Sequence, residues 1–247
     1  MIRRRLKQRI LIIIVTAVLS IASSITRSHS VPDPNLPPLK AHELPQFLVD
    51  WQDPSSNEDY FEQIEAGAMG YLVWSQFPVK VYLEQPQVVE NTAANKRFRE
   101  WALSVKGAIA EWNEYFPLQE TAQREIADIV ILRSQPEREI TLNPDTGLYD
   151  IPRAIAAQTN YTFYLTENPA KIGLRMTVQV SDNFVGESLL ATIRHELGHA
   201  LGIWGHSPEE SDTLYFSQVS QPPPISARDL NTLKKIYQQP TRLGWEI

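Results

Sequence analysis

Residues 195 to 206 read HELGHALGIWGH, and this stretch carries the strongest structural signal in the chain. His195 and His199 are four residues apart, so on an α-helix they lie one turn apart on the same face. That spacing lets two imidazoles reach one metal ion from a rigid backbone. Glu196 points about a third of a turn away, where it is better placed to contact a water molecule held by the ion than the ion itself. The pattern predicts a metal site with an adjacent general base.

The residues after His199 predict a third ligand. Gly202 comes where the helix must end for another side chain to reach the metal, and glycine adopts the required left-handed conformation at little steric cost. His206 follows, and three of the five histidines of the chain fall in this stretch. We expect His206 as the third ligand, with Asp212 as its rival. The simpler alternative is a buried amphipathic helix with hydrogen-bonded histidines, and it leaves Glu196 and the glycines unexplained.

The stretch resembles the signature of the metzincin metallopeptidases, HExxHxxGxxH followed by a methionine turn, and the small matrixin-like members in particular. Four residues occupy the family's positions: His195, Glu196, His199 and Gly202. Three residues separate Gly202 from His206 where the family has two, and we expect Gly205 to absorb the extra one. Residues 211 to 215, SDTLY, resemble the methionine turn with Leu214 in the methionine position. Leucine and methionine are similar in volume, so a packing platform beneath the metal can survive this exchange.

The resemblance implies an α/β (α+β) fold, a metzincin-like zincin domain. Such a domain has a twisted mixed sheet of about five strands, a backing helix, an active-site helix and a C-terminal helix. The resemblance also implies Zn²⁺ as the cofactor and an exported zinc-dependent endopeptidase. In such an enzyme, Glu196 activates a zinc-bound water to hydrolyse peptide bonds of a protein or peptide substrate. Two alternatives stay open: a catalytically degenerate zincin that binds peptides or zinc, and an exported structural protein with incidental zinc.

Further side chains near the motif are expected to surround the site. Tyr215 either hydrogen-bonds near the metal or only packs after the turn. Trp204 is expected to cover the edge of the site. Phe184 and the loop from Ser217 to Pro224 are expected to shape a pocket for a substrate side chain.

Composition excludes several classes of protein. The chain has no cysteine, which excludes a disulfide framework, a thiolate zinc site and the cysteine switch that keeps many matrixins latent. It also excludes a lipid-modified cysteine anchor. Residues 1 to 30 contain six of the 23 Lys and Arg residues and none of the 29 acidic ones. The remainder is therefore about twelve charges negative, which argues against nucleic-acid binding.

The N-terminus predicts export. A basic start, MIRRRLKQR, precedes an apolar run and then small residues, the arrangement of a secretory signal. We expect residues 1–24 to be a signal peptide or, if uncleaved, an N-terminal anchor that uses residues 10–25. The run is short for a membrane span. The protein is then secreted, periplasmic or anchored outside the cytoplasm, and we expect it to be a monomer.

Three further segments complete the expected organisation. Six prolines between Val31 and Pro54 block regular structure, so we expect residues 25–69 to be a proline-rich spacer or pro-segment. The catalytic domain is expected over residues 70–240, with a tail at 241–247. A chain starting near Tyr71 should then be about as active as a longer one.

Hydrophobic periodicity predicts the order of elements in the domain. A loop is expected over residues 133–152. The expected strands are Tyr71–Leu83, Ala127–Leu132, Gln158–Leu165 and Leu174–Val180. The expected helices are Asn95–Phe116, Phe184–Leu201 and Ala227–Tyr237, the last with Ser226 as its N-cap. This order matches that of a matrixin-like catalytic domain.

Overall fold

The structure, a computed structural model, describes residues 36–56, 58–86, 92–136, 141–142, 149–150, 156–217 and 219–247. The expected signal or anchor over residues 1–24 lies outside these residues. Among the described residues, no helix combines the length and the hydropathy needed to cross a membrane.

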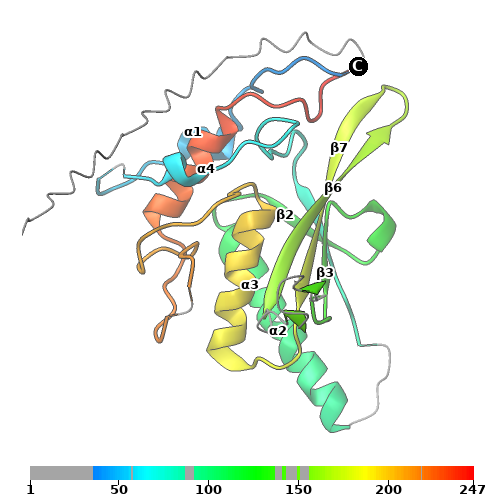
Figure 1. Cartoon of the computed structure of the whole chain (residues 1–247), viewed down its shortest axis with the longest axis vertical. Coiled ribbons are helices and arrows are strands. Elements are labelled where there is room, and N and C mark those ends of the chain that lie inside the picture. The colour runs from blue at the N-terminus through cyan, green and yellow to red at the C-terminus, as the bar shows by residue number, and fades with distance from the viewer. Residues whose placement is uncertain are drawn as a thin grey trace, which may run out of the picture. The chain divides into compact units, whose positions relative to one another are not determined.

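A twisted sheet with strand order β2-β1-β3-β7-β6 organises the fold (Figure 1). Its strands are β1 (Val79–Leu83), β2 (Leu118–Thr121), β3 (Ile129–Leu132), β6 (Ala157–Thr166) and β7 (Lys171–Val180). The β1–β2, β1–β3 and β3–β7 pairs are parallel, whereas β6 runs antiparallel to β7 at the edge. The expectation of a mixed five-stranded sheet in an α+β fold is confirmed.

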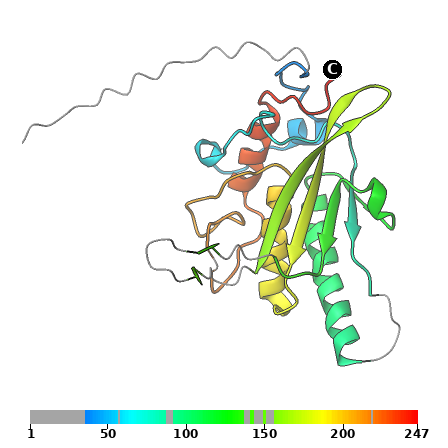
Figure 2. The ribbon, with the colours of Figure 1, turned by 45° about the vertical axis from the view of Figure 1, so that its right-hand side comes forward.

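Two long helices cover one face of this sheet. Helix α2 (Ala93–Asn113) lies beside helix α3 (Gly186–Ala200). The long β6–β7 hairpin runs alongside α3 in Figure 1 and passes in front of it in Figure 2. The Trp112 indole Nε1 donates a hydrogen bond to the Arg194 carbonyl oxygen at 2.8 Å, which ties α2 to α3. Helices are therefore present close to both of the ranges expected, Asn95–Phe116 and Phe184–Leu201.

The predicted apolar stripe of α2 faces the core. Trp101, Val105, Ile109 and Trp112 are buried, and Phe98 is half-buried. Strand β7 alternates between buried and half-buried residues along its whole length, as a strand with one covered face does. The buried side chains of α2 and β7 thus belong to one hydrophobic core.

Two expected elements differ from the structure. The strand expected over Tyr71–Leu83 begins only at Val79, because Pro78 has no N–H to donate and β1 pairs on both sides. In the segment expected to be a loop, strand β4 (Thr141–Leu142) pairs antiparallel with β5 (Tyr149–Asp150). The loop prediction is wrong at those four residues, and most of the rest of that segment lies outside the described ones.

The N-terminal segment, residues 36 to 70, is part of the folded unit rather than a spacer. It contains a short helix α1 (Gln46–Asp50) and a 3-10 turn η1 (Phe61–Gln63). Leu48, Tyr60 and Ile64 are at most 7% exposed and belong to the core. The expected C-terminal tail is folded too: Lys40 pairs with Thr241, which is fully buried.

Helix α4 (Ala227–Tyr237) follows the sequence prediction, including its cap. The Ser226 hydroxyl accepts a hydrogen bond from the Asp229 N–H, and the Asp229 carboxylate accepts one from the Ser226 N–H. This capping box satisfies two helix-end donors. Helix α4 lies beside α1, where the Lys234 ammonium donates to the Trp51 carbonyl oxygen at 2.8 Å (Figure 1).

Candidate metal centre

Helix α3 places His195 and His199 on one face, one turn apart. Their Nε2 atoms are 3.1 Å from each other. The two rings are nearly perpendicular, with centroids 4.8 Å apart. The four-residue spacing therefore produces the convergence of two imidazoles that the sequence predicts.

The other ring nitrogen of each histidine is held by a backbone carbonyl. Nδ1 of His195 donates to the Thr213 oxygen at 2.8 Å, and Nδ1 of His199 donates to the Ile203 oxygen at 2.7 Å. A carbonyl oxygen only accepts, so each neutral ring carries its proton on Nδ1 and a lone pair on Nε2. Two lone pairs at this distance repel one another unless a cation lies between them. The donor set therefore fits a metal ion, with the carbonyl partners that orient metal-binding histidines.

A sharp reversal after α3 brings His206 to the same place. Gly202 has φ of +121°, and a Cβ there would collide with the Leu72 carbonyl oxygen. Gly205 has no room for a side chain either, because a Cβ would collide with the Gln63 carbonyl oxygen. The extra residue before His206 is thus accommodated by close backbone packing against the N-terminal segment.

The three histidines form one cluster. Among the described residues, the possible ligand atoms of His195, His199 and His206 lie within 4.8 Å of one another. The His206 ring stacks on the His195 ring at a centroid distance of 5.3 Å. These three side chains are close enough to bind one metal ion.

Burial keeps the cluster ready to bind a cation. It lowers the pKa of His195 and of His199 to about 4, and the neighbouring His199 ring contributes to the shift at His195. Burial also lowers the pKa of His206. The rings are therefore neutral near pH 7, which is the form that binds metals.

Glu196 lies beside the cluster but points to a different partner. Its side chain is 8% exposed, and the Thr159 hydroxyl on strand β6 donates to its Oε2 at 2.6 Å. Burial raises the pKa of Glu196, whereas the hydrogen bond from Thr159 opposes that shift. A buried carboxylate with a raised pKa is a stronger base than one in water.

Leu214 forms the floor beneath the metal helix. It is fully buried, and a Cβ on Gly198 would collide with its side chain. The Leu214 backbone is fixed as well, since its carbonyl oxygen accepts from the Ser207 N–H at 2.8 Å. Leu214 thus packs directly against helix α3 at Gly198, the residue before His199.

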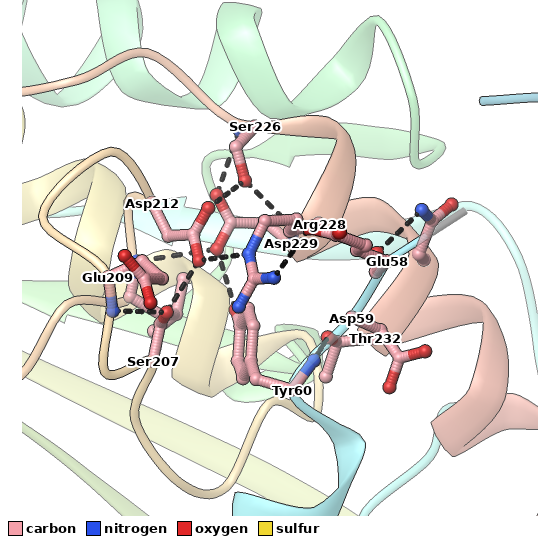
Figure 3. A network of polar contacts seen from close by, with 12 residues as sticks. Glu58, Asp59, Tyr60, Ser207, Glu209, Asp212, Ser226, Arg228, Asp229 and Thr232 are labelled. Carbon is pink, nitrogen blue, oxygen red and sulfur yellow. Dashed lines mark hydrogen bonds and ion pairs between the residues drawn. The ribbon is translucent and has the colours of Figure 1, made fainter. Parts of the chain in front are cut away.

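Asp212 is held within the protein rather than in the histidine cluster (Figure 3). Its Oδ1 accepts from the Ser226 hydroxyl at 2.7 Å, and its Oδ2 accepts from Arg228 Nε at 2.9 Å and from the Ser207 hydroxyl. The carboxylate is 1% exposed. It links Ser207, inside the segment that we define as the metal loop (residues 203 to 215), to Ser226 and Arg228 at the start of α4.

Asp229 supports the same loop, a role that no pattern in the sequence predicts. Its carboxylate accepts hydrogen bonds from the Thr213 N–H at 2.9 Å and from the Tyr60 hydroxyl at 2.6 Å. The Thr213 carbonyl oxygen in turn accepts from His195, so a chain of contacts joins the N-terminal segment to His195. Figure 3 shows the part of this chain between Tyr60 and Asp229. The sequence predicted only Ser226 as the cap of this helix, and Tyr60 lay in the segment expected to be a spacer or pro-segment.

Some aromatic residues near the motif line the cleft, and others pack against the core. Tyr215 lines the cleft, but its hydroxyl contacts Glu210 at 3.5 Å. The Trp204 ring lies against Tyr161 and near His199, at centroid distances of 4.9 and 6.0 Å, at the edge of the site as expected. Phe184 packs against the core and is not among the residues that line the cleft.

Two cavities flank the histidines and make up one cleft. The first, of about 600 Å³, lies between α3 and the segment after Tyr215, where Val219, Pro222 and Pro223 line it. The second, of about 690 Å³, is lined by Trp204 and by Gln63 and Glu65 of the N-terminal segment. His195, Glu196 and His206 line both. The expected pocket-forming loop is confirmed for those of its residues that line the first cavity.

No protein-family model matches the chain, and neither does any curated protein.

Proposed function

We propose that this chain is a zinc-dependent endopeptidase of the metzincin type. The observation that carries the proposal is the pair of Nε2 lone pairs converging at 3.1 Å on α3, with the buried Glu196 carboxylate beside them. A purely structural metal site needs no base next to its ligands. A structural helix would not hold two histidines with their lone pairs facing each other.

Zinc fits the ligand set better than the other common metals. Three neutral imidazoles leave one position of a tetrahedral site open, the arrangement of catalytic zinc. Calcium and magnesium prefer oxygen ligands, and the nearby Asp212 oxygens already accept hydrogen bonds. When bound, zinc supplies Lewis-acid chemistry, polarising the substrate carbonyl and lowering the pKa of a water molecule.

Glu196 is the proposed general base. Its carboxylate lies at the floor of the cleft and keeps Oε2 on the Thr159 hydroxyl, so Oε1 is available to a water molecule in the cleft. It accepts the proton of the attacking water and passes it to the leaving amine. Burial lowers the pKa of His195, His199 and His206, so the three rings stay neutral and do not compete with Glu196 for this proton.

The substrate is proposed to bind as an extended peptide along β6. This strand ends the sheet, and its residues Ala157, Gln158 and Thr159 line the cleft next to Glu196. An edge strand offers backbone N–H and C=O groups to an added strand. A peptide laid there passes over the histidines with a side chain able to enter the first cavity.

The two departures from the metzincin pattern do not weaken the proposal. The extra residue before His206 is accommodated at Gly205, and Leu214 provides an apolar floor. Neither departure displaces a histidine from the cluster. We also propose export through the signal or anchor at residues 1–24. Cell fractionation that finds the full-length protein soluble in the cytoplasm would contradict this second proposal.

Two measurements on the full chain and its Glu196→Gln variant test the proposal. We expect about one zinc per chain in both proteins by metal analysis. We expect peptide hydrolysis only in the parent, with a loss of roughly 10²- to 10⁴-fold in the variant. The variant keeps the shape of the side chain, so its folding should not change.

Each alternative predicts a different outcome. Zinc without hydrolysis across a broad peptide library would favour the degenerate zincin. Equal hydrolysis in both proteins would mean that another group is the base. Absence of zinc after equilibration would reject the metal centre altogether.

A further inference from the structure

We infer that Thr159 is a positioning residue for Glu196, fixing the general base from the strand along which the substrate lies. This inference rests on the proposed function for its catalytic meaning. The two residues are 37 positions apart and come from different elements, strand β6 and helix α3.

The hydrogen bond is short and directed at one oxygen. Thr159 Oγ1 is 2.6 Å from Glu196 Oε2 and 3.0 Å from the Glu196 carbonyl oxygen. A hydroxyl has one proton to donate, and a 2.6 Å distance is typical of donation to an ionised carboxylate. The proton therefore goes to Oε2.

Both partners are enclosed, so the bond has little competition from water. Thr159 is 7% exposed and Glu196 is 8% exposed. Among the described residues, no other side chain donates a hydrogen bond to this carboxylate. A glutamate has three side-chain torsions, and this hydroxyl is the contact that selects one orientation among them.

The backbone that carries the hydroxyl is rigid. Thr159 pairs with Val178 in the antiparallel β6–β7 ladder, the longest pairing of the sheet that the structure describes. The next residue back, Gln158, lines the cleft along which we place the peptide. One strand therefore sets the position of both the substrate and the base, and the relative geometry of the two does not depend on a mobile loop.

Removing the hydroxyl should affect the reaction step rather than substrate binding. In Thr159→Val the side chain keeps its shape but cannot donate, which leaves Oε2 unsatisfied and the carboxylate free to rotate. We expect kcat to fall roughly tenfold to a hundredfold, the cost of a misplaced catalytic group, with KM and zinc content unchanged. Thr159→Ser, which keeps the donor, should restore most of kcat. Thr177→Val, at a half-buried threonine of the neighbouring strand β7 that lines neither cavity, is the matched control and should behave as the parent.

A binding measurement separates this inference from the proposed function. A peptide hydroxamate loses a proton when it chelates zinc, and a correctly placed Glu196 accepts that proton. Its affinity, measured by calorimetry on the zinc-loaded protein, should fall in Thr159→Val and recover in Thr159→Ser. If the parent hydrolyses no peptide, the endopeptidase proposal fails while this measurement still decides the role of Thr159.

Three results would overturn the inference. The first is a Thr159→Val variant whose kcat and hydroxamate affinity both equal those of the parent. The second is a serine variant as impaired as the valine variant, which would point to packing by the methyl group. The third is loss of zinc or of folding in Thr159→Val, which would assign the hydroxyl to the stability of the fold.

Discussion

Helix α3 and the N-terminal segment meet the metal loop from two sides. Helix α3 contributes His195 and His199 through a spacing of four residues within one element. The N-terminal segment contributes Tyr60, whose hydroxyl reaches Asp229 across 169 positions of sequence, and Gln63, whose backbone packs on Gly205. The first region bears two of the three clustered histidines, and the second packs against the loop that carries the third, His206. A site of this kind therefore has a local part and a long-range part, and each responds to different changes.

The sharpest test of this comparison removes the N-terminal segment. A chain starting at Tyr71 loses the buried Leu48, Tyr60 and Ile64. Deleting large core side chains costs about 2–5 kcal/mol each, against a total stability of about 5–15 kcal/mol. We expect this chain to lack cooperative unfolding by circular dichroism, whereas a chain starting at Leu36 should unfold cooperatively.

This expectation reverses the one drawn from the sequence, in which a chain starting near Tyr71 keeps its activity. A shortened chain that is folded and binds zinc would show that the N-terminal segment is a dispensable cover after all.

The reason for that difference is physical. The prolines of the N-terminal segment correctly predict little regular structure, since its helices are short. Absence of regular structure does not mean absence of packing, and single residues such as Tyr60 and Ile64 carry no periodic signal. By contrast, α2 and α3 were predictable because their apolar residues repeat at helical spacing. Helix α4 was predictable to its end residues because its cap is local.

The candidate site also has parts that the sequence predicts and parts that it does not. His195, His199 and His206 follow from spacing and from the glycines that permit the reversal. The backbone carbonyls of Thr213 and Ile203, which orient the two helical histidines, could not be predicted. Every residue has a backbone carbonyl, so the residue type does not indicate which one binds a histidine. Asp229 was missed because an acidic residue in the first turn of a helix is common, and nothing in the sequence shows that its carboxylate also contacts Tyr60 and Thr213.

The next largest effect distinguishes ligands from loop anchors. His206→Ala should weaken zinc affinity by more than about a hundredfold, since loss of a ligand exceeds the 10- to 100-fold effect of outer-shell partners. Asp212→Asn keeps a similar shape and should change zinc affinity less, while lowering the free energy of unfolding through the lost pair with Arg228. Zinc competition with a chelator and urea unfolding measure the two quantities. The reverse pattern in zinc affinity would make Asp212 the ligand.

A smaller effect is expected where the two regions touch. Tyr60→Phe removes the donor to the buried Asp229 carboxylate, and leaving such an acceptor unsatisfied costs about 1–3 kcal/mol. Urea unfolding of the metal-free protein measures this loss. Tyr164→Phe, at a ring that is 43% exposed on the β6–β7 hairpin, should leave stability unchanged. Equal stability of both variants would show that the Tyr60 contact is not what joins the N-terminal segment to the metal loop.

The smallest effect is expected at the floor of the metal helix, where the chain departs from the methionine of the family. Leu214 is fully buried against Gly198, and methionine has nearly the same volume with an unbranched, adaptable chain. Leu214→Met should therefore change the free energy of unfolding by less than about 1.5 kcal/mol, with zinc affinity and peptide hydrolysis unchanged. Leu214→Ala is the matched contrast, because the cavity it leaves should cost about 2–5 kcal/mol. A large gain of hydrolysis in Leu214→Met would mean that the sulfur atom, and not only the apolar volume, supports the reaction. Leucine would then mark a step toward a zincin that binds peptides without cleaving them.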